Sequence, residues 1–151
     1  MSTPLLQLRV LDLSTLLPGP YASMMLADMG AEVLRVEALG RHDLVNSFKP
    51  AHQGISHAFL TLNRNKKTIL LDLKKQEAVE IVKKLIKTHD VLLEQFRPGV
   101  MGKFGLDYQT LKAINPKLIY CSITGYGQNG CYKNRAGHDI NYLALSGLAS
   151  Y

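Results

Sequence analysis

Two stretches, Leu8-Arg-Val-Leu-Asp-Leu-Ser14 and Ala31-Glu-Val-Leu-Arg-Val-Glu37, decide the fold of this chain. Each has the length and the alternation of apolar residues that are typical of a short β-strand. Between them, residues 18–20 supply a proline-rich turn, residues 21–29 are rich in Ala, Met and Leu, and Gly30 is placed to end a helix. A strand, a helix and a strand in this order form a βαβ unit, which joins parallel strands through a right-handed crossover. The sequence therefore predicts an α/β fold.

The same alternation of strands and helices continues towards the C-terminus. The sequence predicts further strands at residues 68–72, 90–94 and 117–124, and helices at residues 74–88, 100–104 and 108–114. Residues 38–56 are mixed and polar and indicate a long connection, and long connections in compact domains are often functional. We therefore expect an open, mostly parallel, Rossmann-like sheet with helices on both faces, in one domain over residues 1–151.

Composition narrows the classes of protein and partner. With 151 residues and 46% hydrophobic content, the chain is long enough for one globular core. The net charge is +6, but the basic residues are dispersed without a basic tail or interleaved aromatic residues, so nucleic acid is not the expected partner. No segment has the length and apolarity of a membrane span, and no signal peptide is apparent. Cys121 and Cys131 lack metal-site spacing, and Cys121 lies in a strand that we expect to be buried, which together favour a reduced, cytoplasmic protein without a metal.

The glycine-rich stretch at residues 125–130 marks a loop in which the backbone bends sharply or comes close to another group. A helix of about three turns is predicted from Asp139, with an apolar face. That face consists of Ile140, Leu143, Ala144, Gly147 and Leu148. His138 and Asp139 then lie at the helix N-terminus, where partial positive charge disfavours a protonated imidazole and keeps His138 available as a base. The alternative is an ordinary helix-start aspartate beside a partly buried loop histidine.

Three further groups of polar residues are candidates for ligand binding. Glu37 is placed like the acid of a dinucleotide site, but no G-x-G-x-x-G loop accompanies it, which argues against a nicotinamide cofactor. Basic residues at 64–67 suit either a polyanion or a solvated turn. Residues 95–97 follow a buried strand, and in open α/β sheets such loops bind ligands, although a bare turn is an equal alternative.

Several pieces of the sequence, taken in order, resemble the family III CoA-transferases, a superfamily that includes α-methylacyl-CoA racemase. The pieces are Val10-Leu-Asp-Leu13, Pro18-Gly-Pro20, Leu26-Ala-Asp-Met-Gly-Ala-Glu-Val33, Asn65-Lys66-Lys67, Leu71-Asp-Leu73, Asp90-Val-Leu-Leu-Glu94, Phe96-Arg-Pro-Gly-Val100 and Gly137-His-Asp-Ile-Asn-Tyr142. The resemblance covers almost the whole chain and implies the N-terminal, CoA-binding α/β part of that fold. It also implies that the chain is part of a longer protein.

Position 138 distinguishes the branches of the superfamily, because transferases usually carry an aromatic residue there and racemases a histidine. The resemblance therefore implies a 2-methylacyl-CoA racemase that works by two-base proton exchange through an enolate, with His138 and Asp139 as the catalytic residues on this chain. The second base of the family is an aspartate beyond Tyr151, so we expect the 151-residue chain to be inactive. The alternatives are a CoA-transferase, which uses a downstream aspartate as nucleophile, and a non-catalytic CoA-binding module.

The resemblance also implies where CoA is bound, as part of the acyl-CoA substrate and without a covalently attached cofactor. Residues that match the lining of the nucleotide and pantetheine are Leu71, Gln95, Phe96, Arg97 and Lys103; those near the thioester are Gly137, Asp139 and Tyr142. Two positions depart from the pattern: Ala38 replaces an arginine that often contacts CoA, with Arg35 or Arg41 as substitutes, and Lys103 replaces an arginine of some transferases. Family members form interlocked homodimers, which makes a homodimer the expected assembly.

Overall fold

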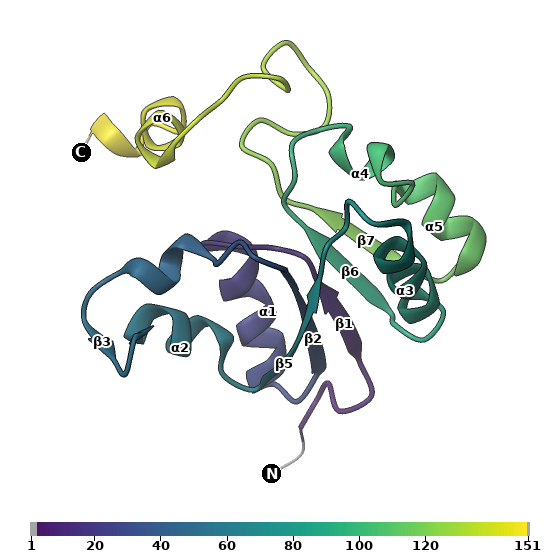
Figure 1. Ribbon diagram of the computed structural model, residues 1–151. Helices are drawn as coiled ribbons and strands as arrows, with labels where there is room; N and C mark the ends of the chain where they lie inside the picture. The colour runs from purple at the N-terminus through teal and green to yellow at the C-terminus, as the bar shows by residue number, and fades with distance from the viewer. Residues whose placement is uncertain (1–2, 151) are drawn as a thin grey trace.

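A five-stranded parallel sheet lies at the centre of the computed structural model, which describes residues 3–150 (Figure 1). The strands in chain order are β1 (Arg9–Asp12), β2 (Glu32–Ala38), β5 (Lys66–Leu71), β6 (Val91–Glu94) and β7 (Ile119–Ser122). In space the order is β5-β2-β1-β6-β7, and every neighbouring pair is parallel. The expected open, parallel, Rossmann-like sheet is confirmed.

Helices cover both faces of the sheet, as expected (Figure 1). One face carries α1 (Pro18–Asp28) and α2 (His57–Asn63), and the other carries α3 (Gln76–Ile86), α4 (Val100–Lys103) and α5 (Tyr108–Ile114). Because successive side chains of a strand point to opposite faces, Val10 packs with Ala27 under α1, while Leu11 packs with Val82 under α3. The cluster under α3, α4 and α5 is the larger of the two cores.

The helix ends follow local sequence signals. Helix α1 has prolines in its first turn, where a missing N–H costs nothing, and it ends before Gly30, whose φ of +100° suits glycine. Helix α3 buries Ala78, Val82 and Ile86 along one face and carries lysines in its last turn, where they meet the negative end of the helix dipole.

The long connection between β2 and β5 is ordered. It contains a 3₁₀ helix, η1 (Leu44–Ser47), and a small hairpin of β3 (Ala51–His52) and β4 (Ile55–Ser56). Asp43 caps η1 by accepting the Val45 N–H, and Ser56 caps α2 by accepting the Phe59 N–H. These caps fix the first turns of η1 and α2.

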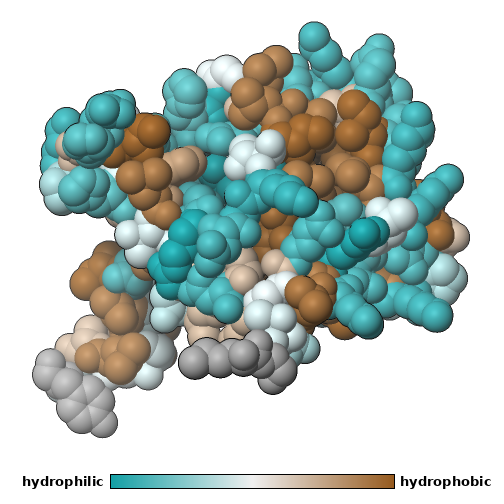
Figure 2. All heavy atoms as spheres, turned by 90° about the horizontal axis from the view of Figure 1, so that it is seen from below, coloured by the Kyte–Doolittle hydropathy of each residue, from teal (hydrophilic) through white to brown (hydrophobic). Residues whose placement is uncertain are grey.

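The C-terminal segment departs from the prediction. Helix α6 (Asp139–Leu145) has seven residues, about two turns and not three, and η2 (Leu148–Ser150) follows it. The predicted helix is interrupted at Gly147, which has a φ of +82°. The predicted apolar face is not buried, because Ile140 and Leu148 remain 67% and 61% exposed. This segment projects from the body of the molecule, and apolar side chains lie on its surface at the lower left of Figure 2.

Cys121 was also predicted wrongly, since it is exposed and not buried. The reason is that β7 is an edge strand of the sheet, and its side chains are only partly covered. Within residues 3–150, no helix has the length and apolarity to cross a membrane, and no group of three His, Cys, Asp or Glu residues comes together as a metal site would require.

Candidate functional site

The loops after β1 and β6 meet at the carboxyl edge of the sheet. The Leu13 N–H donates to the Leu93 carbonyl at 2.8 Å, which extends the pairing of the strands by one residue. Beyond it, Gln95 Nε2 donates to Thr15 Oγ1 at 3.1 Å. In open α/β sheets, ligands bind at this edge. The two loops therefore form one surface, and Gln95 lies at the junction.

Gly19 allows these loops to pack closely. A Cβ at this position would overlap the Ser14 side chain and lie 3.2 Å from Gln95 Oε1. That oxygen is buried and has no hydrogen-bond partner among the described residues. The Gln95 amide is thus fixed on its donor side by Thr15 and unsatisfied on its acceptor side.

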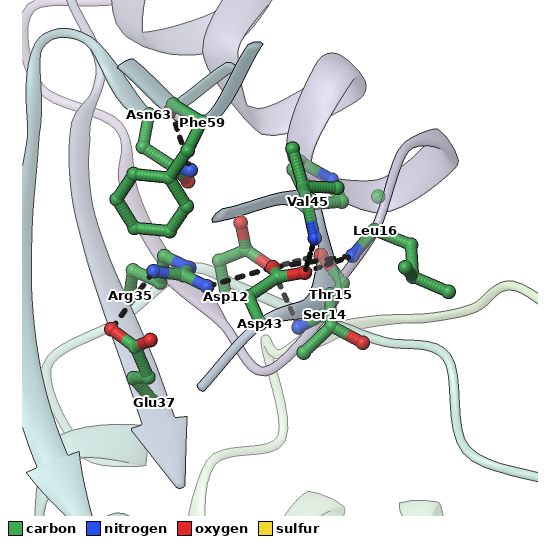
Figure 3. A network of polar contacts seen from close by, with 12 residues as sticks. Asp12, Ser14, Thr15, Leu16, Arg35, Glu37, Asp43, Val45, Phe59 and Asn63 are labelled. Carbon is green, nitrogen blue, oxygen red and sulfur yellow. Dashed lines mark hydrogen bonds and ion pairs between the residues drawn. The ribbon is translucent and has the colours of Figure 1, made fainter. Parts of the chain in front are cut away.

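A buried ionic network shapes the loop after β1 (Figure 3). Arg35 has no exposed side-chain surface and pairs with Asp43 at 2.9 Å and with Glu37 at 3.1 Å. Its guanidinium carbon also lies 5.0 Å from the centre of the Phe59 ring. Both carboxylate oxygens of Asp43 accept the Leu16 N–H at 3.2 Å, and Leu16 has a φ of +62°, which is uncommon for a leucine. The network therefore holds this loop in a conformation that leucine disfavours.

A second buried network connects β1, α1 and β5. Asp12 accepts the Ser14 N–H at 2.8 Å and also the hydroxyls of Ser14 and Ser23. Lys66 Nζ lies 3.5 Å from Asp12 and donates to the Pro20 carbonyl at 2.8 Å. Burial lowers the pKa of Lys66, and the nearby Asp12 carboxylate opposes that shift.

The basic residues at 64–67 form internal ion pairs. Lys66 is buried, Lys67 pairs with Glu32 at 2.9 Å, and Arg64 pairs with Asp28. Arg64 and Asn65 form an exposed turn, in agreement with the solvated-turn alternative, whereas the Lys66 side chain is buried. Each cation has an acidic partner in the fold, which disfavours a polyanion site.

Glu94 joins the ends of β6 and β7. It is 3% exposed, and its carboxylate accepts the Ser122 hydroxyl and, at 2.7 Å, the Phe96 N–H. Burial raises the pKa of Glu94, and the two hydrogen bonds oppose the shift. Glu94 borders a hollow of about 570 Å³ beside β7, which Arg97 and Tyr120 also line. Burial raises the pKa of Tyr120 as well, and the charge of Glu94 adds to that shift.

The predicted nucleotide and pantetheine residues gather at this same edge of the sheet. Arg97 and Lys103 are exposed, and Phe96 is half-buried, edge-on to Phe104 with ring centres 6.1 Å apart. Leu71 is the last residue of β5, and its side chain is buried in the core, with the residue 8% exposed. Its side chain therefore does not face the surface at this edge. Of the two arginines expected to substitute at Ala38, Arg35 is fully buried in its ion pairs and cannot reach a ligand, whereas Arg41 is exposed.

The predicted thioester residues lie on and before α6. His138 is exposed and precedes the first helical residue, Asp139, and its N–H donates to Asn141 Oδ1 at 2.9 Å. Gly137 and Tyr142 are half-buried and pack against each other. The fold brings these residues together with one another but not with the first group, because α6 stands apart from the sheet layers (Figure 1).

Sequence reasoning missed the buried charges that shape the edge: Asp12, Arg35, Asp43, Lys66 and Glu94. A signal was present, because Asp12, Arg35 and Glu94 each follow directly after apolar residues within a strand. In a parallel sheet covered on both faces, such a residue is buried and requires a polar partner. The partners themselves lie far away in sequence.

A sequence profile of CoA-transferase family III matches residues 5–151. The chain belongs to this family. Two similar relatives have different names: succinate–glutarate CoA-transferase of Agrobacterium fabrum is 42% identical over 97% of this chain, and alpha-methylacyl-CoA racemase of Mus musculus is 46% identical over 94% of it. The family III resemblance is thus confirmed, and both branches are represented among its relatives.

The solved structures agree. A crystal structure of a CAIB/BAIF family protein from Brucella suis superposes with a TM-score of 0.91 at 40% identity, over 97% of this chain and 40% of that one. The chain likewise spans 38% of the Agrobacterium transferase and 33% of the mouse racemase. This family III chain therefore corresponds to between a third and two fifths of its relatives.

Proposed function

We propose that this chain is the CoA-binding part of a 2-methylacyl-CoA racemase, an enzyme that exchanges the α-proton of its thioester substrate. The observation that carries the proposal is His138, an exposed imidazole beside Gly137 at the start of α6. The resemblance associates histidine at this position with the racemase branch. Because the chain spans a third of the mouse racemase, the activity is proposed for the whole protein, and the 151-residue chain alone is expected to be inactive.

In the proposed reaction, the His138 imidazole removes the α-proton from one face of the substrate. This step leaves an imidazolium and an enolate thioester. A second acid then delivers a proton to the opposite face, so that the configuration inverts and the number of protons is unchanged. By resemblance that acid is an aspartate further along than Tyr151.

CoA is proposed to bind at the carboxyl edge of the sheet as part of the substrate, without a covalently attached cofactor. Arg97 and Lys103 are exposed cations there and suit its phosphates. Arg41 is proposed to replace the arginine that Ala38 lacks, since Arg35 is buried. The partly buried Phe96 offers an apolar surface to the adenine ring.

The test replaces His138 in a protein that extends through the second base. We expect His138→Ala to slow exchange of the α-proton of a 2-methylacyl-CoA with deuterated solvent, followed by NMR, by about 100-fold or more. His52→Ala, in the exposed hairpin, is the matched control and is expected to exchange at the unmodified rate. Unchanged exchange in His138→Ala would contradict the proposal.

A CoA-transferase is the second candidate, favoured by the 42% identity to succinate–glutarate CoA-transferase of Agrobacterium fabrum. Such an enzyme needs a carboxylate acceptor and a downstream nucleophile but not the imidazole of His138. Transfer of CoA from succinyl-CoA to glutarate that survives His138→Ala, without exchange of an α-proton, would establish this candidate instead.

We also propose that the whole protein is a homodimer of interlocked chains, as in the family it resembles. The exposed apolar residues of α6 and η2, including Ile140, Leu145 and Leu148, support the proposal because large exposed apolar side chains are typical of contact surfaces. Light scattering of the whole protein tests it, and the mass of a single chain at micromolar concentration would contradict it.

A further inference from the structure

At two glycines before α6, a side chain is excluded by lack of space and not by the backbone conformation. Gly125 and Gly137 do not have a positive φ, whereas Gly127 and Gly130 have φ values of +77° and +90°. At Gly137 a Cβ would lie 2.7 Å from the phenol oxygen of Tyr142, and at Gly125 it would overlap that phenol. The two glycines therefore form a cradle that only a residue without a Cβ permits.

The ring in the cradle belongs to a cluster of three tyrosines. Tyr142 lies edge-on to Tyr126 with ring centres 5.3 Å apart, and Tyr126 lies edge-on to Tyr132 at 5.9 Å. The guanidinium carbon of Arg135 is 4.4 Å from the centre of the Tyr132 ring. Edge-on aromatic pairs and a cation over a ring are favourable contacts. The cluster thus joins the loop after β7 to α6.

Few other contacts hold α6 in place. The last hydrogen bond from the sheet to this segment runs from the Ile123 N–H to the Glu94 carbonyl at 2.8 Å. All hydrogen bonds found for residues 124–150 stay within that segment, and its described residues form no ion pair. The position of α6 relative to the loop therefore depends on the packing of Tyr142.

We propose that Tyr142 is the positioning residue for His138. The two residues are four apart, and the Tyr142 N–H donates to the His138 carbonyl at 3.3 Å, so they share one side of the first turn of α6. Seating the Tyr142 ring on Gly125 and Gly137 fixes that turn and therefore the direction of the imidazole. The functional importance of Tyr142 rests on the proposed role of His138. The packing of Tyr142 on Gly125 and Gly137 does not depend on that role.

The test measures the orientation of α6 directly. Residual dipolar couplings of the amides of residues 139–145 are compared with those of the sheet strands in the 151-residue chain. In the unmodified chain and in Tyr142→Phe, which keeps the ring, we expect both sets to fit one alignment. In Tyr142→Ala and Gly125→Ala we expect the α6 couplings to depart from that fit and its amides to exchange with deuterated water about tenfold faster.

Matched controls separate this effect from a general loss of structure. Tyr21→Ala removes an exposed tyrosine from α1, and Gly102→Ala adds a Cβ where nothing lies within 4 Å, so neither is expected to change α6. The urea midpoint of the sheet is expected to stay the same in Tyr142→Ala and Gly125→Ala, because the tyrosine cluster lies outside both cores.

Two outcomes would overturn the proposal: α6 couplings that already fail to fit the sheet in the unmodified chain, or couplings that fit equally well in Tyr142→Ala. Neither readout needs catalysis. If Tyr142→Ala releases α6 but His138→Ala leaves proton exchange intact, the proposed function fails alone. If proton exchange needs His138 but α6 stays fixed in Tyr142→Ala, the positioning role fails alone.

Discussion

At the scale of single residues, the buried pair of Arg35 and Asp43 has the largest expected effect on stability. Asp43→Ala leaves the fully buried Arg35 guanidinium without its 2.9 Å partner and frees the Leu16 N–H. Arg35 keeps Glu37 at 3.1 Å, but removing one partner of a buried charge is costly, so we expect a loss of about 3–5 kcal/mol in the free energy of unfolding by urea. Lys67→Ala, which breaks an exposed pair with Glu32, is the control and is expected to change little. Equal losses in both variants would contradict the role of burial.

Glu94 gives a prediction about pH. Burial raises its pKa in the folded protein, so the folded state favours the protonated carboxyl relative to the unfolded chain, where the pKa is near 4.5. Its stabilising contribution is therefore complete below that value and is lost as pH rises through the folded pKa. Glu94→Gln cannot ionise and serves as the reference. The free energy of unfolding of the native chain minus that of Glu94→Gln should therefore fall as pH rises from about 4.5 through the raised pKa of the folded state. A flat difference in urea titrations would refute it.

The residue scale also shows what the sequence predicts and what it does not. Gln95 and Arg97 were placed at the carboxyl edge because a residue that follows an apolar strand must lie there. The resemblance suggests Arg35 as a ligand contact, yet Arg35 is buried with its partner Asp43. Asp43 lies in the connection between β2 and β5, and the strand pattern does not reveal the path of that connection. Strand position is local information, whereas burial depends on residues distant in sequence.

At the scale of elements, the five strands of the sheet and helices α1, α3, α4 and α5 were predicted within a few residues, since burial on both faces of a parallel sheet favours apolar residues in its strands. Helix α2, the 3₁₀ helix η1 and the hairpin of β3 and β4 were not predicted. Helix α6 was predicted too long. The apolar spacing of Ile140, Leu143 and Leu148 is helical, but Gly147 adopts a φ of +82°, and among the described elements none covers the helix face that holds Ile140. Periodicity identifies an apolar face without identifying its partner.

Helix α5 offers a test of a single helix end. Asp107 accepts the Thr110 N–H at 3.0 Å and the Thr110 hydroxyl at 2.8 Å, and these hydrogen bonds lower the pKa of Asp107. Asp107→Ala should destabilise the protein by about 1 kcal/mol in urea unfolding, and Asp107→Asn by less, because asparagine also caps helices. The difference between the native chain and Asp107→Ala should shrink as pH falls through the lowered pKa. Gln109→Ala, exposed in the same helix, is the control.

At the scale of the whole molecule, the parallel sheet and the family were predictable because short motifs of the family lie along almost the entire chain. The complete site was not predictable, since the chain spans 33% of the mouse racemase. The predicted thioester residues around His138 also stand apart from the predicted nucleotide residues around Arg97. Bringing the two groups together requires contacts that these 151 residues do not themselves make. Binding of CoA to the sheet edge, by contrast, is testable on this chain.

A phosphate site at the sheet edge can be distinguished from general attraction of CoA by the net charge of +6. Arg97→Ala removes an exposed cation at the carboxyl edge of the sheet and should weaken binding of CoA by about 1.5–3 kcal/mol in calorimetry, as expected for a hydrogen bond to a charged group. Lys87→Ala makes the same change in charge at the end of α3, near the opposite edge, and should have little effect. Equal losses in both variants would show attraction by net charge alone, and no binding at millimolar CoA would remove CoA recognition from residues 1–151.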